Sequence, residues 1–227
     1  MRNIKGAIFD ADGTMIDSMS IWDTVAGIYL RSQGAQPRPD LNSRLLEIGS
    51  NRFPAYFQES YGVKQTEDEI RTAINDMLVH EYGSKAPAKD GVIQTLGALR
   101  EGGIKMCVVT ATDRHLIEPV LKRNGLLDYF TCVFTCNEEG TNKHSPDIFI
   151  RAAAFLGTEI SETVIFEDAL YAIETAKTAG FSVVGVFDET SRHHQDDIKR
   201  IADYYYTTLS DFRIDHFYDL SFPNEND

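Results

Sequence analysis

The strongest constraint on how this chain can fold is a regular alternation of strand-like and helix-like segments after Pro87. The strand candidates are short, largely apolar runs at residues 104–109, 131–135, 163–166, 182–187 and 204–207. Helical stretches separate them, among them residues 92–100, 146–156 and 169–179. Because parallel neighbours need crossover connections, this alternation predicts an α/β fold with a parallel sheet and helices on both faces.

The first part of the chain follows a different pattern. An apolar strand candidate at residues 4–9 comes first, and from about residue 17 to 87 the spacing of apolar residues becomes helical. The apolar positions that repeat at this spacing include Trp22, Val25, Ala26, Tyr29 and Leu30, and later Ile70, Ala73, Ile74, Met77 and Leu78. We therefore expect a core formed by residues 1–15 and 88–227, with an all-helical unit at residues 16–87 inserted after the first strand.

Three local signals concern the ends and the continuity of helices. Thr66 and Glu69 form a capping-box pattern, which predicts that a helix begins directly after Thr66. Ser145 is expected at the N-cap of another helix, with Pro146 at its first helical position. Pro119 is expected to kink or split the helix in which it lies.

Composition and charge exclude several classes of partner. The chain has 22 Lys and Arg against 35 Asp and Glu, a formal charge of −13 at pH 7, and its lack of a basic run argues against nucleic acid. No segment approaches the ~20 apolar residues of a membrane span, and the first residues lack the apolar stretch of a signal peptide. We expect a cytoplasmic monomer with no membrane partner, in which Cys107, Cys132 and Cys136 pack in the core.

Polar residues follow the predicted strands where those strands end. In open parallel sheets, ligands bind beyond the carboxyl ends of the strands. The residues expected at this edge are Asp10, Asp12, Thr110, Glu167 and Asp168, with Lys143 in the loop before the Pro146 helix. Each pair of the four carboxylates would repel by about 4 kcal/mol at 4 Å with an effective dielectric constant near 20. A cation must compensate, and oxygen ligands favour Mg²⁺ together with a substrate phosphate.

The chemistry that this edge predicts is phosphoryl transfer. A carboxylate can attack phosphorus to form an aspartyl-phosphate, provided that cations neutralise the charge of the phosphate it approaches. Alone, each motif has a structural alternative: the first two aspartates could cap a turn, and Glu167 and Asp168 could be helix N-terminal charges.

The four motifs, Asp10-Ala11-Asp12-Gly13-Thr14, Thr110, Lys143 and Glu167-Asp168, resemble those of the haloacid dehalogenase-like (HAD) superfamily in identity and order. The helical insertion resembles its C1-type cap, as in phosphoglycolate phosphatase-like and β-phosphoglucomutase-like members. The resemblance implies a Rossmann-like core with an inserted helical cap, and a phosphatase that acts on a small phosphorylated metabolite.

The resemblance also implies residue roles. Asp10 would be the nucleophile, and Asp12 would protonate the leaving oxygen and then activate water. Thr110 and the backbone amide of Ala111 would hold the phosphoryl oxygens, and Lys143 would pair with nucleophile and phosphate.

The metal ligands follow from the same resemblance. Mg²⁺ would be bound by the carboxylates of Asp10 and Asp168 and by the backbone carbonyl of Asp12, with Glu167 helping directly or through water.

The chain departs from the family pattern in places. His144 follows the lysine where relatives often have proline, and Ala169 and Ala172 stand where serine and glycine are common. In the cap, Arg52 ends the sequence Gly49-Ser50-Asn51-Arg52, where related caps often place a substrate-reading loop; it is a candidate substrate contact, and the alternative is a surface salt bridge.

Three functions remain open at this stage. The leading one is a Mg²⁺-dependent phosphatase that hydrolyses a small phosphate monoester. The second is a sugar phosphomutase, favoured by the Gly49 and Arg52 pattern but opposed by Trp22, because mutase relatives typically have histidine there. The third is a non-catalytic scaffold that binds a phosphometabolite.

Overall fold

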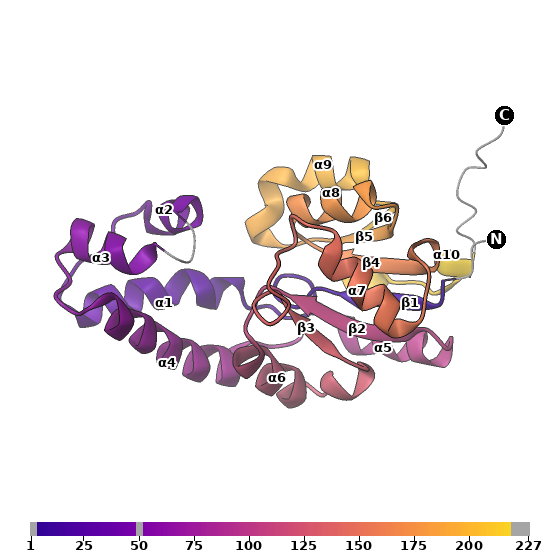
Figure 1. Ribbon diagram of the computed structural model, residues 1–227, viewed down its shortest axis with the longest axis horizontal. Coiled ribbons are helices and arrows are strands. Elements are labelled where there is room, and N and C mark those ends of the chain that lie inside the picture. Colours follow the sequence, from indigo (N-terminus) through magenta and orange to yellow (C-terminus); the bar gives the residue numbers. More distant parts are fainter. Residues whose placement is uncertain (1–3, 49–51, 219–227) are drawn as a thin grey trace. The chain divides into compact units, whose positions relative to one another are not determined.

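The computed structural model describes residues 4–48 and 52–218, and in it the chain divides into two compact units (Figure 1). One unit comprises residues 1–17 and 87–227, and the other comprises Ser18–Ala86. In the part of the chain that the structure describes, no helix combines the length and the apolar character needed to cross a bilayer.

The larger unit is built on a sheet in which, within the described residues, six parallel strands pair in the order β3-β2-β1-β4-β5-β6. The strands are β1 (Gly6–Phe9), β2 (Lys105–Thr110), β3 (Val133–Thr135), β4 (Thr163–Glu167), β5 (Ser182–Val186) and β6 (Tyr204–Tyr206). This order confirms the predicted α/β fold with a parallel sheet. The ends of the strands differ from the predicted ends by up to two residues. The chain reverses its direction of travel across the sheet between β1 and β4, where open sheets of this kind bind ligands.

Helices cover both faces of this sheet. The helices of this unit are α5 (Val92–Glu101), α6 (Arg114–Arg123), α7 (Asp147–Leu156), α8 (Leu170–Thr178), α9 (Gln195–Ile201) and α10 (Asp215–Tyr218). Short 3₁₀ helices lie at η1 (Leu127–Tyr129), η2 (Ile160–Glu162), η3 (Glu189–His194) and η4 (Leu209–Asp211). Helices α7, α8 and α9 share a buried apolar cluster with Ile8 and Ile165 of the central strands. On the opposite side of these strands, the rings of Phe9 and Phe166 stack with centroids 4.1 Å apart, and Phe217 of α10 packs edge-on against Phe166.

The structure contradicts one prediction about helices and part of another. Pro119 does not split its helix, because α6 is continuous from Arg114 to Arg123, and a kink at Pro119 stays a prediction. Its buried apolar face, Leu116, Ile117, Val120 and Leu121, offsets the roughly 3 kcal/mol that an internal proline costs. Helix α7 begins at Asp147, so Pro146 is the N-cap: its carbonyl accepts the first helical bond from the Ile150 amide at 3.0 Å.

The smaller unit is all-helical within the described residues. Its helices are α1 (Met19–Ser32), α2 (Leu41–Ile48), α3 (Phe53–Tyr61) and α4 (Glu67–Lys85). They enclose a separate apolar core around Tyr29, Phe57 and Ile70, as the helical spacing predicts, while the side chain of Trp22 lies outside the described part. The predicted capping box is present, because Thr66 accepts a hydrogen bond from the Glu69 amide and the Glu69 side chain bonds the Thr66 amide.

The insertion leaves and rejoins the core at adjacent points of the larger unit. The Asp17 amide donates to the Pro87 carbonyl at 2.9 Å, and the Lys89 amide donates to the Met15 carbonyl at 2.8 Å. These two bonds hold the outgoing and returning segments side by side directly after the turn that follows β1. The helical insertion therefore leaves the strand pairing of the core intact.

Candidate active site

The first motif lies in a tight turn after β1. Asp10 is buried and its amide donates to the carbonyl of Phe166 on β4 at 3.0 Å, which fixes the turn beside the end of that strand. Gly13 has a φ of +86°, and a Cβ at this position would lie 2.5 Å from Oδ2 of Asp168. Only glycine fits, because both the backbone conformation and the close carboxylate exclude a side chain.

Lys143 joins two of the acidic motifs. It is 3% exposed, and its Nζ forms ion pairs with Asp10 Oδ1 and with Glu167 Oε2, the latter at 2.9 Å. Burial lowers the pKa of Lys143, but the charges of Asp10 and Glu167 outweigh burial and leave the pKa above its ordinary value. The lysine therefore stays an ammonium ion, paired with the candidate nucleophile.

The three carboxyl groups of this cluster strongly influence one another. Burial raises the pKa of Asp10, although the Lys143 charge beside it acts in the opposite direction. Burial together with the Asp10 charge raises the pKa of Glu167 to about 8. Burial and the charges of Asp10 and Glu167 hold the pKa of Asp168 well above its usual range. One lysine is too little cationic charge for this cluster, and an added divalent cation would favour the ionised carboxylates.

The donor set fits such a cation. Asp10, Glu167 and Asp168 each offer one carboxylate oxygen, and these atoms lie within 4.8 Å of one another. The Thr14 hydroxyl, which is fully buried, donates to Asp168 Oδ1 at 2.9 Å and orients that carboxylate. Oxygen donors suit Mg²⁺, and the expected backbone ligand, Asp12, lies in the turn directly after Asp10.

The second motif follows β2. Thr110 is buried at the end of this strand, and its hydroxyl accepts a hydrogen bond from the Thr112 amide at 3.0 Å, whereas Ala111 is exposed. The Thr112 hydroxyl donates to Asp12 Oδ2 at 2.6 Å. The turn after β2 therefore orients the second aspartate of the first motif, a role for Thr112 that its sequence position did not indicate.

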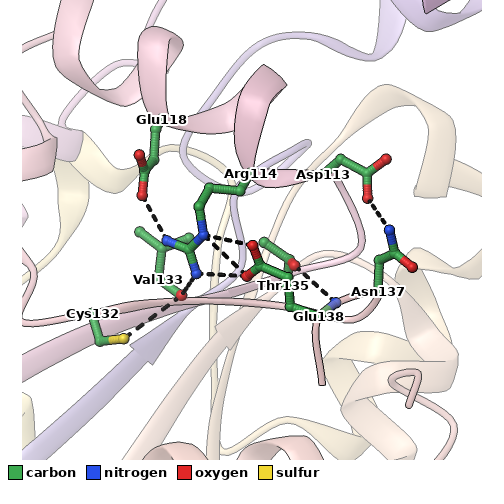
Figure 2. A network of polar contacts seen from close by, with 8 residues as sticks. All are labelled: Asp113, Arg114, Glu118, Cys132, Val133, Thr135, Asn137 and Glu138. Carbon is green, nitrogen blue, oxygen red and sulfur yellow. Dashed lines mark hydrogen bonds and ion pairs between the residues drawn. The ribbon is translucent and has the colours of Figure 1, made fainter. Parts of the chain in front are cut away.

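A polar network beside α6 ties this turn to the loop after β3 (Figure 2). The Arg114 guanidinium donates to both carboxylate oxygens of Glu138 at 2.6–3.0 Å and to the Val133 carbonyl at 2.7 Å. Asn137 Nδ2 donates to Asp113 Oδ1 at 3.1 Å. These contacts join the segment that carries Thr110 to the segment that carries Lys143.

Sequence reasoning also missed Lys89. Its Nζ donates to the Gly13 carbonyl, to the Phe187 carbonyl at 2.7 Å and to Asp188 Oδ2 at 3.0 Å. Lys89 thus ties the turn after β1 to the segment after β5. No local pattern distinguishes it from a surface lysine, because its three partners come from distant parts of the chain.

The structure brings together most of the predicted site residues at one edge of the sheet. Asp10, Lys143, Glu167 and Asp168 form the buried cluster, and Asp12 and Thr110 are linked through Thr112. Arg52 belongs to the other unit, where it is the exposed N-cap residue of α3, and residues 49–51 lie outside the described part. A contact between Arg52 and substrate stays a prediction.

Comparison with known proteins places this fold and motif order in one class. Residues 7–186 match the family model described as haloacid dehalogenase-like hydrolase. The match spans most of the sheet and all four motifs. The chain therefore belongs to the haloacid dehalogenase-like hydrolase family.

Individual relatives match this chain over most of the length of both proteins. The chain is 28% identical to fructose-1-phosphate phosphatase YqaB of Escherichia coli K12, over 80% of this chain and 95% of that protein. It is 22% identical to the phosphorylated carbohydrates phosphatase of Thermotoga maritima, over 78% and 82% of the two chains. The structure of β-phosphoglucomutase from Clostridium difficile superposes with a TM-score of 0.72 at 19% identity, over 95% and 96%, which shows a shared fold.

Proposed function

We propose that this protein is a Mg²⁺-dependent phosphatase that hydrolyses a small phosphate monoester through an aspartyl-phosphate intermediate. The observation that carries the proposal is the buried cluster in which Lys143 pairs with Asp10 and Glu167, beside Asp168. A nucleophilic carboxylate, a fixed ammonium group and a metal-binding carboxylate pair are the groups that phosphoryl transfer to an aspartate requires. Relatives named as sugar phosphate phosphatases support a phosphorylated sugar or similar metabolite as substrate.

Asp10 and Asp12 have different roles in the proposed reaction. A carboxylate oxygen of Asp10 forms a bond to phosphorus while the bond from phosphorus to the ester oxygen breaks. Asp12 gives its proton to that leaving oxygen, so that an alcohol departs. In the second half, Asp12 takes a proton from water, which attacks phosphorus and releases inorganic phosphate and the free Asp10 carboxylate.

The remaining residues hold the phosphoryl group. The Lys143 ammonium, already paired with Asp10, neutralises one phosphoryl oxygen, and the Thr110 hydroxyl with the Ala111 amide binds others. Thr112 orients Asp12 through its hydrogen bond of 2.6 Å. Asp10, Glu167, Asp168 and the Asp12 carbonyl would hold Mg²⁺, which when bound neutralises phosphate charge as a Lewis acid.

Release of inorganic phosphate from a panel of phosphate monoesters, with and without Mg²⁺, tests the proposal. We expect Mg²⁺-dependent release by the wild type and none by Asp10→Asn, which is nearly isosteric but cannot attack phosphorus. A circular dichroism spectrum of the variant that matches the wild type would show that the fold is intact.

The same panel separates the other two functions. Isomerisation of a sugar phosphate without net phosphate release would identify a phosphomutase instead. Binding of a phosphometabolite without either reaction would identify a scaffold. Either result would overturn the phosphatase proposal.

A further inference from the structure

The loop between β3 and α7, residues 136–146, carries Lys143 and is held at both ends. At its start, Asn137 and Glu138 bind the first residues of α6 through the network of Figure 2. At its end, the imidazole ring of His144 stacks on the phenol ring of Tyr171 from α8, with centroids 4.3 Å apart and planes 26° apart. We call this second contact the His144–Tyr171 stack.

The two anchors differ in how directly they restrict Lys143. The start anchor lies several residues away, and the intervening segment contains Gly140 at a φ of +62°. The end anchor is the residue directly after Lys143. The His144 amide also donates to Asn142 Oδ1 at 2.9 Å, so both the backbone and the ring of His144 are held. The stack therefore acts on the residue next to Lys143 in the chain, closer in sequence than the anchor at Asn137 and Glu138.

Tyr171 connects this anchor to the other side of the cluster. It lies in the first turn of α8, the helix that follows Glu167 and Asp168. The stack and the ion pair between Lys143 and Glu167 thus join the same two chain segments. Burial raises the pKa of Tyr171 to about 12, although the Lys143 charge acts in the opposite direction, so the phenol stays neutral. Tyr171 remains 40% exposed.

We propose that the His144–Tyr171 stack positions Lys143 for phosphoryl transfer. The inference rests on the proposed function, because the exact place of the ammonium group matters only if Asp10 accepts a phosphoryl group. The ion pairs with Asp10 and Glu167 hold the Lys143 ammonium group, and the position of the Lys143 backbone decides whether its flexible side chain reaches both carboxylates. A displacement of about 1 Å in such a group can cost up to about 100-fold in rate. His144 and Tyr171 are accordingly positioning residues that act through Lys143.

Steady-state kinetics on two esters test this proposal. The assay uses p-nitrophenyl phosphate and the best monoester from the panel, with Tyr171→Ala, Tyr171→Phe, His144→Ala and the double alanine variant. We expect Tyr171→Ala to lower kcat about 10-fold on both esters with little change in KM, because a misplaced ammonium affects the transferring group itself. Tyr171→Phe keeps the stacked ring and should retain kcat. His144→Ala should show the same loss, and the double variant no further loss, because both residues act as one unit.

Phe155→Ala is the matched control. Phe155 is 57% exposed and its ring pairs edge-on with that of Phe134 at 5.6 Å, so the substitution removes a ring pair of the same unit that involves neither His144 nor Tyr171. We expect its kcat to equal that of the wild type. Amide hydrogen exchange in residues 137–145 should become faster in Tyr171→Ala but not in Tyr171→Phe or Phe155→Ala.

Several outcomes would overturn the role of the stack. A raised KM on the preferred ester alone would make the rings a substrate contact, and wild-type kinetics in Tyr171→Ala would make the stack a surface packing contact. Equal losses in Phe155→Ala would point to general destabilisation. An inactive wild type would overturn the proposed function and this inference together, whereas an active wild type with an unaffected Tyr171→Ala overturns the inference alone.

Discussion

Asp12 and Asp10 stand two residues apart yet differ in their surroundings. Asp10 is buried, which raises its pKa, while the Lys143 charge beside it favours the ionised carboxylate that the proposed nucleophile needs. Asp12 is partly exposed and is held by the Thr112 hydroxyl. The less buried position suits a group that exchanges protons with a leaving alcohol and with water, and the contact to Thr112 fixes its direction.

The dependence of turnover on the leaving group should reveal the role of Asp12. The variant Asp12→Asn lacks the transferable proton, so we expect its turnover of alkyl phosphates to fall by about 10²- to 10⁴-fold. Aryl phosphates should lose much less, because their leaving groups need no proton. Rates measured across a series of esters with different leaving-group pKa values check this, and an alkyl phosphate rate equal to that of the wild type would refute the assignment.

Arg52 allows a test of specificity. If it contacts the organic part of the substrate, Arg52→Ala should lower kcat/KM for the preferred ester by roughly 10-fold or more, because remote contacts supply orienting energy. Turnover of p-nitrophenyl phosphate should barely change. Lys64, an exposed cation of the same unit, provides the matched control as Lys64→Ala. Wild-type kinetics of Arg52→Ala on the preferred ester would return Arg52 to the role of a surface charge.

At the scale of elements, the turns that follow the strands position the site. The Gly13 turn, the Thr110–Thr112 turn and the Lys143 loop each combine local hydrogen bonds with contacts to a distant segment of the chain. Strand ends supply rigid starting points, and the side-chain contacts set the direction of each turn. This division explains why site residues cluster directly after strands.

Helix α4 offers a pH test of its own start. The hydrogen bonds from Thr66 hold the pKa of Glu69 below its ordinary value of 4.5. A lowered pKa in the folded state means that the stabilising contribution is present above pH 4.5 and is lost as the pH falls through the lowered value. We expect an NMR titration of Glu69 to show a midpoint below 4.5 in the wild type.

The variant Thr66→Ala removes the hydroxyl that accepts from the Glu69 amide and donates to the Glu69 carboxylate, but it keeps the backbone amide that also donates to that carboxylate. It should move the Glu69 midpoint back toward 4.5 and reduce the stability of this helix, since loss of an N-cap costs about 1 kcal/mol. Thermal unfolding followed by circular dichroism measures the second effect. A wild-type midpoint at or above 4.5 would show that the capping box does not form in solution.

At the scale of the whole molecule, we expect the acidic cluster to couple Mg²⁺ binding to stability. Mg²⁺ at 100 times its dissociation constant should stabilise the folded chain by about 2.7 kcal/mol. For a chain of this size the gain corresponds to a rise in Tm of roughly 5–10 °C. Scanning calorimetry with EDTA and then with Mg²⁺ measures it.

Asp168→Asn is the informative control for that measurement. It removes one charge from the cluster, so the metal-free variant should unfold at a higher temperature than the metal-free wild type. The rise in Tm on adding Mg²⁺ should become much smaller, and activity should be lost. A full Mg²⁺ response in this variant would contradict the assignment of Asp168 as a ligand.

Much of the architecture could be predicted from the sequence because its determinants are local. Apolar periodicity of 2 or 3.6 residues distinguishes strands from helices, and the polar residues directly after strands reveal the ligand-binding edge. The continuity of helices does not follow from local sequence in the same way: the helix with Pro119 stays continuous because buried packing on one face outweighs a local penalty. That balance depends on neighbours that local sequence does not identify.

Only the tertiary structure decided which side chains hold the catalytic groups in place. Thr14 reaches Asp168, Lys89 reaches Gly13 and Asp188, and His144 reaches Tyr171, all across long separations in the chain. A threonine, a lysine or a histidine carries no local mark of such a partner. The sequence by itself determined the class of fold and the chemical groups at its edge, because periodicity and motif order are properties of the linear chain. The contacts that orient those groups depend on strand order and packing, which exist only once the chain has folded.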